Sequence, residues 1–197
     1  MNDPTITLLR AAFATGRMPQ GTLYGDQGAR PDAAALKPAA VLVPVVLRPE
    51  PSVLFTRRTA HLNAHSGQIS FPGGRADPTD ASPEETALRE TAEEVGLARA
   101  QIELLGRLSD YHTRTGYRIT PIVGLVQPPF ELQPNPNEVA EVFEVPLAFV
   151  LDPSNHQRHE RVDAGQTRGF FAIPFGDYFI WGATAGMLVN LRRFLHA

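Results

Sequence analysis

The chain has 197 residues, 43% of them hydrophobic, which favours one compact domain whose core needs neither disulfides nor structural metals. The 18 basic and 21 acidic residues give a formal net charge of −3, and the scattered basic residues argue against nucleic acid as a partner. Cysteine is absent, which excludes thiolate metal sites, and the longest apolar run, residues 39–47, is too short to span a bilayer.

The N-terminal part is predicted to form a short helix and a loose lead-in. Residues 5–15 carry apolar side chains at helical spacing, and residues 16–38 are rich in Gly, Pro, Ala and Asp. We therefore assign residues 1–35 to an N-terminal helix and lead-in segment, and residues 36–197 to the main domain. No internal repeat or second domain boundary is visible in the sequence.

The sequence of the main domain predicts both strands and helices, an α+β class. Apolar or β-branched runs predict strands at 41–47, 53–57, 102–108, 119–126, 139–145 and 170–173. The segment 127–137, with four prolines and two asparagines, predicts a loop. Residues 183–195 place apolar side chains on one helical face, which predicts a C-terminal helix.

A helix predicted for residues 83–95 has start and stop signals at both ends. Ser82 is a favourable N-cap residue, Pro83 takes the first helical position, and Glu85 follows three residues after the cap. Gly96 follows the helix where a C-terminal cap needs a positive φ. Local sequence is therefore expected to set both helix ends.

Three glutamates of this helix are the first candidates for a chemical site. Glu90, Glu93 and Glu94 are three and four residues apart, so their side chains project from one helix face. Like charges at this spacing repel, and a hard divalent cation that accepts oxygen ligands would offset the repulsion. From the glutamates alone, a solvated acidic helix face is the preferred interpretation.

The residues around the glutamates reverse that preference. Residues 73–97 read GGRADPTDASPEETALRETAEEVGL. This stretch resembles the Nudix box, the signature of the Nudix hydrolases, in Gly74, Arg89, Glu90, Glu93, Glu94, Gly96 and Leu97. It departs from the common box by one extra residue between Gly74 and Arg89 and by Thr91 at a usually aliphatic position, and Asp80 stands near the place of the box's early glutamate.

The resemblance implies a fold, a cofactor and roles for the box residues. The Nudix fold is a mixed β-sheet sandwiched between α-helices, which we assign to residues 36–197. The cofactor would be Mg²⁺ or Mn²⁺, with Glu90 and Glu94 as direct ligands and Glu93 as a further ligand, direct or through water, and a catalytic carboxylate. Arg89 would orient these carboxylates as part of the catalytic set.

The glycines and a later acidic residue complete the predicted centre. Gly73 and Gly74 would shape the substrate-binding loop against the box helix. Glu138 follows the 127–137 loop at the entrance of a predicted strand and is the candidate general base, with Glu141 in reserve. For either acid, an ordinary exposed position at a strand end is an equal alternative.

The segment before the box points to a substrate. Residues 54–74, LFTRRTAHLNAHSGQISFPGG, resemble the extra motif of the coenzyme A pyrophosphatase branch of the Nudix hydrolases in Leu54, Thr56, Arg58, Gly67 and 71–74. Asn63 and Thr59 depart from that motif, whereas residues 181–185 look like the start of the same branch's C-terminal helix. The implied reaction is hydrolysis of coenzyme A or acyl-CoA to 3′,5′-ADP and 4′-phosphopantetheine or its acylated form.

Four further residues are candidates for substrate binding. Arg58 is the first choice for the 3′-phosphate of coenzyme A and Arg57 the second, because strand alternation places them on opposite faces. His65 and Gln68 flank Gly67 and are candidates for phosphate or ribose contacts, with packing or loop hydrogen bonding as an equal alternative.

Two other functions stay open from the sequence. One is hydrolysis of another nucleoside diphosphate derivative such as ADP-ribose. The other is a catalytically silent Nudix module that senses a nucleotide, against which the complete Arg-Glu and Glu-Glu set argues. We expect a small-molecule nucleotide as the partner, no contact with membrane or nucleic acid, and a cytoplasmic location; a homodimer is left open.

Overall fold

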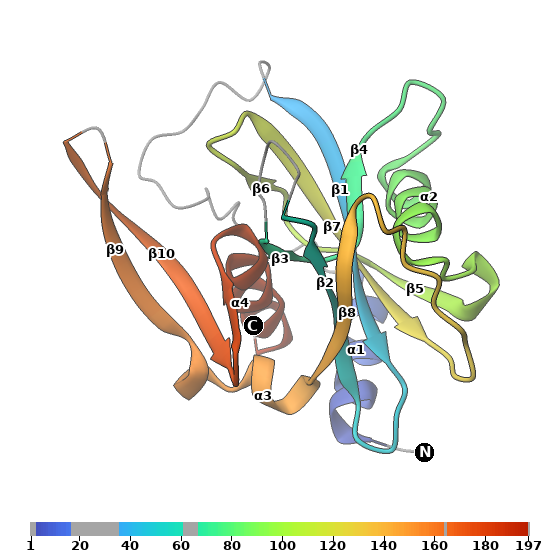
Figure 1. Cartoon of the computed structure of the whole chain (residues 1–197). Coiled ribbons are helices and arrows are strands. Elements are labelled where there is room, and N and C mark those ends of the chain that lie inside the picture. Colours follow the sequence, from blue (N-terminus) through green and yellow to red (C-terminus); the bar gives the residue numbers. More distant parts are fainter. Residues whose placement is uncertain (1–2, 17–35, 61–66, 164, 197) are drawn as a thin grey trace.

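The computed structural model describes residues 3–16, 36–60, 67–163 and 165–196 (Figure 1). The larger sheet contains β1 (Lys37–Val46), β2 (Ser52–Arg58), β3 (Ile69–Ser70), β4 (Gly73–Arg75), β5 (Ile102–Arg107), β6 (Tyr111–His112), β7 (Tyr117–Val126) and β8 (Val139–Pro146). The smaller sheet contains β9 (Gln157–Asp163), β10 (Gln166–Phe175) and β11 (Tyr178–Trp181). The α-helices are α1 (Pro4–Ala14), α2 (Pro83–Val95), α3 (Leu147–Leu151) and α4 (Ala183–Leu195), and short 3-10 turns occupy η2 (Arg99–Gln101) and η3 (Pro153–Asn155).

The larger sheet is mixed, as the resemblance implied. Its strand order is β3-β2-β1-β7-β5, with β4 beside β1, β6 beside β7 and β8 beside β2. Strands β1 and β7 run parallel over their whole length, and the other pairs are antiparallel. Both parallel strands are buried along most of their length, which explains why they read as continuous apolar runs rather than alternating ones.

Helices cover the two faces of this sheet (Figure 1). Along β1, Leu42 packs with Ala87 of α2 on one face. The next residue, Val43, points to the other face and joins the large core cluster that includes Leu188 of α4. Because successive side chains of a strand point to opposite faces, β1 contributes to both layers of the core. The expected α+β class, a mixed sheet between helices, is confirmed.

Helix α2 has the bounds that its capping residues predicted. The Ser82 hydroxyl accepts a hydrogen bond from the backbone N–H of Glu85 at 3.3 Å. Gly96 has φ of 71°, and its N–H donates to the Ala92 carbonyl at 3.0 Å. The two caps bind orphan backbone groups at both helix ends, so the orientation of the glutamate-bearing face is fixed from within the helix.

The main strands and both long predicted helices outside α2 are also confirmed. Strands predicted at 41–47, 53–57, 102–108, 119–126 and 139–145 correspond to β1, β2, β5, β7 and β8, and the predicted helices to α1 and α4. Residues 127–137 form no helix or strand. The smaller sheet is more extensive than the short strand predicted at 170–173, because that strand is the middle of β10, which pairs with β9 and β11.

Helix α1 packs into the same core as the main domain. Ile6 and Leu9 are buried, and the rings of Phe13 and Phe194 lie with centroids 4.7 Å apart. The boundary drawn before residue 36 stays a prediction.

In the ranges that the structure describes, none of the helices is both long and apolar enough to cross a membrane. Cytoplasmic location and oligomeric state stay predictions.

Candidate active site

The acidic face of α2 lies against the glycines of β4. The N–H of Gly73 donates to Glu94 Oε2 at 3.2 Å. A Cβ atom built on Gly74 would lie 2.4 Å from Glu90 Cδ, so the missing side chain makes room for that carboxylate. Gly73 has φ of 149°, and its backbone passes so close to β1 that a Cβ would lie 2.5 Å from the Ala40 carbonyl oxygen. The chain therefore needs glycine at 73 to pass β1, and glycine at 74 leaves room for the Glu90 carboxylate.

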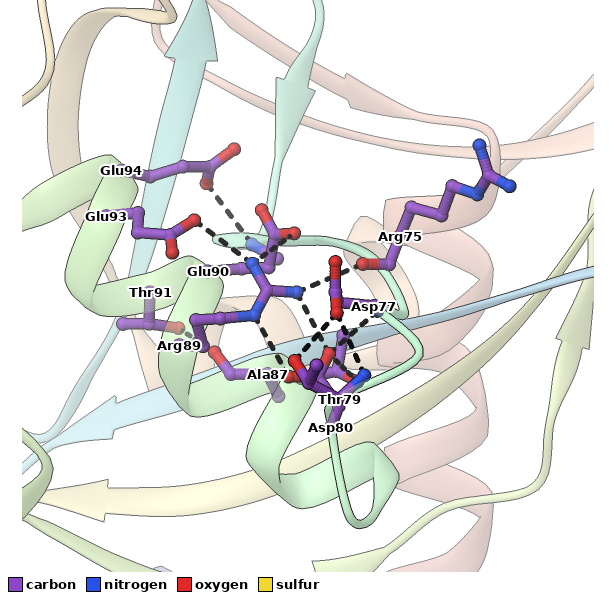
Figure 2. A network of polar contacts seen from close by, with 12 residues as sticks. Arg75, Asp77, Thr79, Asp80, Ala87, Arg89, Glu90, Thr91, Glu93 and Glu94 are labelled. Atoms are coloured by element: carbon purple, nitrogen blue, oxygen red, sulfur yellow. Dashed lines mark hydrogen bonds and ion pairs between the residues drawn. The ribbon is translucent and has the colours of Figure 1, made fainter.

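Arg89 binds three carboxylates with one guanidinium group (Figure 2). Its Nε and Nη2 atoms each donate to one oxygen of Asp80 at 3.0 Å. Its Nη1 donates to Glu90 Oε1 at 2.9 Å and to Glu93 Oε2 at 3.0 Å. Nη2 also donates to the backbone carbonyl of Arg75 at 3.2 Å. The planar fork thus orients two helix carboxylates and fastens them to the loop that follows β4.

Asp80 is the counterion that holds Arg89 in place. Its carboxylate accepts from the Asp77 N–H at 2.9 Å and the Thr86 hydroxyl at 2.9 Å, besides its two bonds from Arg89. These donors, with Arg89 first, hold the pKa of Asp80 well below its usual range. Sequence reasoning gave Asp80 no role in the site. Its signal was its position near the box's early glutamate.

We expect Asp80→Asn to lower kcat by about tenfold, because Arg89 would lose its bidentate partner and the carboxylates of Glu90 and Glu93 would lose their fixed positions. Steady-state kinetics with the preferred substrate would measure the loss. Asp77→Asn is the matched control, since Asp77 lies in the same loop but bonds Thr79 rather than Arg89. Equal kcat for the two variants would contradict the role of Asp80.

Glu94 is the most buried carboxylate of the helix face. The residue is 4% exposed, and burial raises its pKa to about 7. The Gly73 N–H and the charge of Arg58, whose Nη1 lies 3.8 Å from Glu94 Oε1, oppose this shift. The negative charges of Glu138 and Glu90 add to it. Burial also raises the pKa of Glu90, against the bond from Arg89. The centre therefore holds negative charge at a cost that a cation would offset.

The donor set fits a hard divalent ion that keeps part of its water shell. Glu90 and Glu94 offer oxygen atoms, which Mg²⁺ and Mn²⁺ prefer, and the space above Gly74 is kept open for the Glu90 carboxylate. Within the described ranges, no three acidic or imidazole side chains converge into a ready-made cage. Glu93 is largely exposed and turned to Arg89. Ligation by Glu90 and Glu94, and by Glu93 directly or through water, stays a prediction.

The two strand arginines point to different surroundings. Arg58 faces Glu94, whereas the Nη2 of Arg57 contacts Glu141 Oε2 at 2.5 Å on the cross-strand partner β8. The hydroxyl of Tyr178 donates to the other oxygen of Glu141 at 2.6 Å. Arg57 and Glu141 thus bind each other, and their roles in the site stay predictions. Arg57 and Arg58 contact different partners, as the alternation of side chains along a strand predicted.

The remaining predicted residues lie in several places. Glu138 precedes β8, half-buried, and its charge acts on Glu90 and Glu94. The Gln68 backbone carbonyl accepts from the N–H of Arg58 at 3.0 Å, so Gln68 lies beside the strand that carries Arg58. His65 falls outside the described residues.

Thr91, the departure from the box, is buried, and its hydroxyl donates to the Ala87 carbonyl at 2.6 Å, so the polar group is satisfied within the helix.

Comparison with known proteins shows the family of this chain and confirms the expected Nudix fold. Residues 36–165 match the family model of the NUDIX domain, and the chain belongs to the Nudix hydrolase family. It is 43% identical over 155 residues to the Uncharacterized Nudix hydrolase NudL of Photorhabdus laumondii, which covers 79% of this chain and 83% of the relative. The NudL protein of Escherichia coli K12 is 40% identical over 153 residues, covering 78% and 80%. A solved Nudix hydrolase from Mycobacterium smegmatis, RenU, is 24% identical with a TM-score of 0.49, covering 66% of this chain and 81% of that one.

Proposed function

We propose that this Nudix hydrolase cleaves the pyrophosphate bond of coenzyme A or acyl-CoA with Mg²⁺ or Mn²⁺ as cofactor. The observation that supports the hydrolytic reaction is that Glu90 and Glu94 lie against Gly74 and Gly73, with Arg89 orienting Glu90 and the charge of Glu138 acting on both carboxylates. The choice of coenzyme A rests on the motif of residues 54–74.

In this proposal each side chain of the site has a separate role in hydrolysis. A divalent ion, when bound, would supply positive charge for the diphosphate oxygens and would make the attacking water more acidic. Glu90 and Glu94 would hold this ion, and Arg89 keeps Glu90 in place. Glu138 accepts the proton as the water oxygen bonds to phosphorus and the bridging P–O bond breaks, so that the departing phosphate oxygen keeps the electron pair.

Arg58 is the proposed cation for the substrate. Its guanidinium lies 3.8 Å from Glu94, and its Nε is buried without a hydrogen-bond partner within the described residues. The sequence suggested Arg58 for the 3′-phosphate of coenzyme A. Its place beside Glu94 favours a contact with the reacting diphosphate instead, because Glu94 would be a ligand of the ion whose positive charge those oxygens need.

The substrate proposal is tested by product analysis. We expect the purified protein, incubated with Mg²⁺ or Mn²⁺, to convert coenzyme A to 3′,5′-ADP and 4′-phosphopantetheine with a higher kcat/KM than for ADP-ribose. In ¹⁸O-water, mass spectrometry of the two products shows which phosphorus is attacked. Equal or better turnover of ADP-ribose would overturn the coenzyme A assignment, and no turnover of either would favour a nucleotide-sensing module.

A further inference from the structure

The loop between β7 and β8 is attached to the C-terminal end of α2. The N–H of Gln133 donates to the Val95 carbonyl at 2.8 Å, and the N–H of Asn135 donates to the Glu94 carbonyl at 2.9 Å. A Cβ on Gly96 would lie 3.0 Å from Gln133 Cβ, so the loop runs close past the helix cap. The backbone of Glu94, whose side chain enters the site, is thereby bonded directly to this loop.

Asn135 connects this helix end to Glu138. Its backbone carbonyl accepts from the N–H groups of Glu138 at 3.0 Å and Val139 at 2.8 Å. Its side-chain Oδ1 accepts from the N–H of Asn137 at 3.1 Å, which closes an Asx turn. Its Nδ2 points at Glu138 Oε1 in a long contact of 3.5 Å. One residue therefore bonds the backbone of Glu94, the backbone of Glu138 and the Glu138 side chain.

The strand β2 holds Glu138 from the other side. Pairing between β2 and β8 shifts register between Arg57, which faces Glu141, and Arg58, which faces Val139. This bulge lets the next residue, Thr59, reach Glu138, and its N–H donates to the Glu138 carbonyl at 3.0 Å. The Thr59 hydroxyl also donates to the carbonyl of Asn137 at 3.2 Å. The extra residue, Ala140, lies on β8 itself, and Glu138 is thus held between β2 and the loop on α2.

We propose that Asn135 is a positioning residue that sets the Glu138 carboxylate relative to Glu94 and donates a hydrogen bond to it. The inference rests on the proposed function, in which Glu138 receives the proton of the attacking water. A general base must lie within hydrogen-bond reach of its proton, so a small displacement of Glu138 is costly. Asn135 thus acts on the reaction through Glu138.

Two substitutions separate positioning from folding of the loop. Asn135→Ala removes both side-chain contacts, whereas Asn135→Asp keeps an acceptor for the Asn137 N–H but replaces the donor with a charge that repels Glu138. We expect each to lower kcat by about 10- to 100-fold with KM within about threefold. Asn137→Ala, an exposed neighbour whose side chain makes none of these contacts, should keep wild-type kcat. Urea unfolding of each variant reports whether the fold is retained.

A double-mutant cycle with Glu138→Gln gives the decisive readout. If Asn135 acts through Glu138, either Asn135 substitution in the Glu138→Gln background should cost less than about twofold in kcat. The same loss in both backgrounds, or wild-type kcat for Asn135→Asp, would overturn the positioning role. The wild-type assay on coenzyme A and ADP-ribose comes first, and absence of turnover there would overturn the proposed reaction itself.

Discussion

Glu94→Gln is expected to lower kcat for pyrophosphate hydrolysis by about 10²-fold or more, with Mg²⁺ or Mn²⁺ present. Gln keeps the size of the side chain and can still accept the bond from Gly73, but it removes the buried negative charge that would bind the ion. Steady-state kinetics over a range of metal concentrations measures the loss. Wild-type kcat at saturating metal would contradict the ligand role.

The same substitution is expected to stabilise the metal-free protein above neutral pH. The pKa of Glu94 is about 7 in the folded chain, against 4.5 as its ordinary value. The folded state therefore binds the extra proton between these values, so its stability falls as pH rises from about 4.5 to 7. Glu94→Gln removes this dependence and should be more stable than wild type above pH 7, by up to about 3 kcal/mol.

Urea unfolding at pH 5 and pH 8, with EDTA and then with Mn²⁺, tests both consequences. Without metal, the difference between wild type and Glu94→Gln should be largest at pH 8 and fall below about 1 kcal/mol at pH 5. Added Mn²⁺ should stabilise wild type more than the variant, because binding to the folded state alone raises its stability. Glu85→Gln is the matched control on the same helix, since Glu85 forms an exposed ion pair with Arg99. It should alter neither kcat nor the pH dependence.

The features of this site that the sequence predicted are those that depend on the spacing of residues within one short segment. Helix α2 begins and ends at the predicted residues because Ser82 and Gly96 bond its own backbone. The projection of Glu90 and Glu94 from one face follows from helical geometry. The space that the Glu90 carboxylate occupies was indicated only by the glycine pair, because the sequence does not show that β4 packs against the helix.

The part that the sequence did not predict depends on contacts between distant segments. Asp80 lies in an irregular turn, so no periodicity places its carboxylate on Arg89. In the sequence Asn135 is an ordinary loop residue, and its role depends on the hydrogen bond between its N–H and the Glu94 carbonyl at the end of α2. Strand β9 was missed because its sequence, QRHERVD, has almost no apolar residues, and pairing with β10 forms it.

The two adjacent glycines of β4 should respond differently to alanine. Gly73→Ala places a Cβ 2.5 Å from Ala40 O and Val41 Cα, backbone atoms that cannot rotate away, at a φ that favours glycine. We expect it to lose about 3 kcal/mol or more of unfolding free energy. Gly74→Ala instead meets the carboxylate end of Glu90 at 2.4 Å, which can swing aside. Its unfolding free energy should fall by only about 1 kcal/mol.

For Gly74→Ala the large effect is expected on catalysis. The displaced Glu90 would lose its 2.9 Å bond from Arg89 and its place beside Glu94, and kcat should fall by about 10²-fold while the fold persists. Urea unfolding and steady-state kinetics of both variants separate the two outcomes, each variant serving as the control for the other. A folded Gly74→Ala protein with wild-type kcat would mean that the reaction does not need Glu90 in this position, and the ion would then have to be held by Glu94 with other oxygen donors.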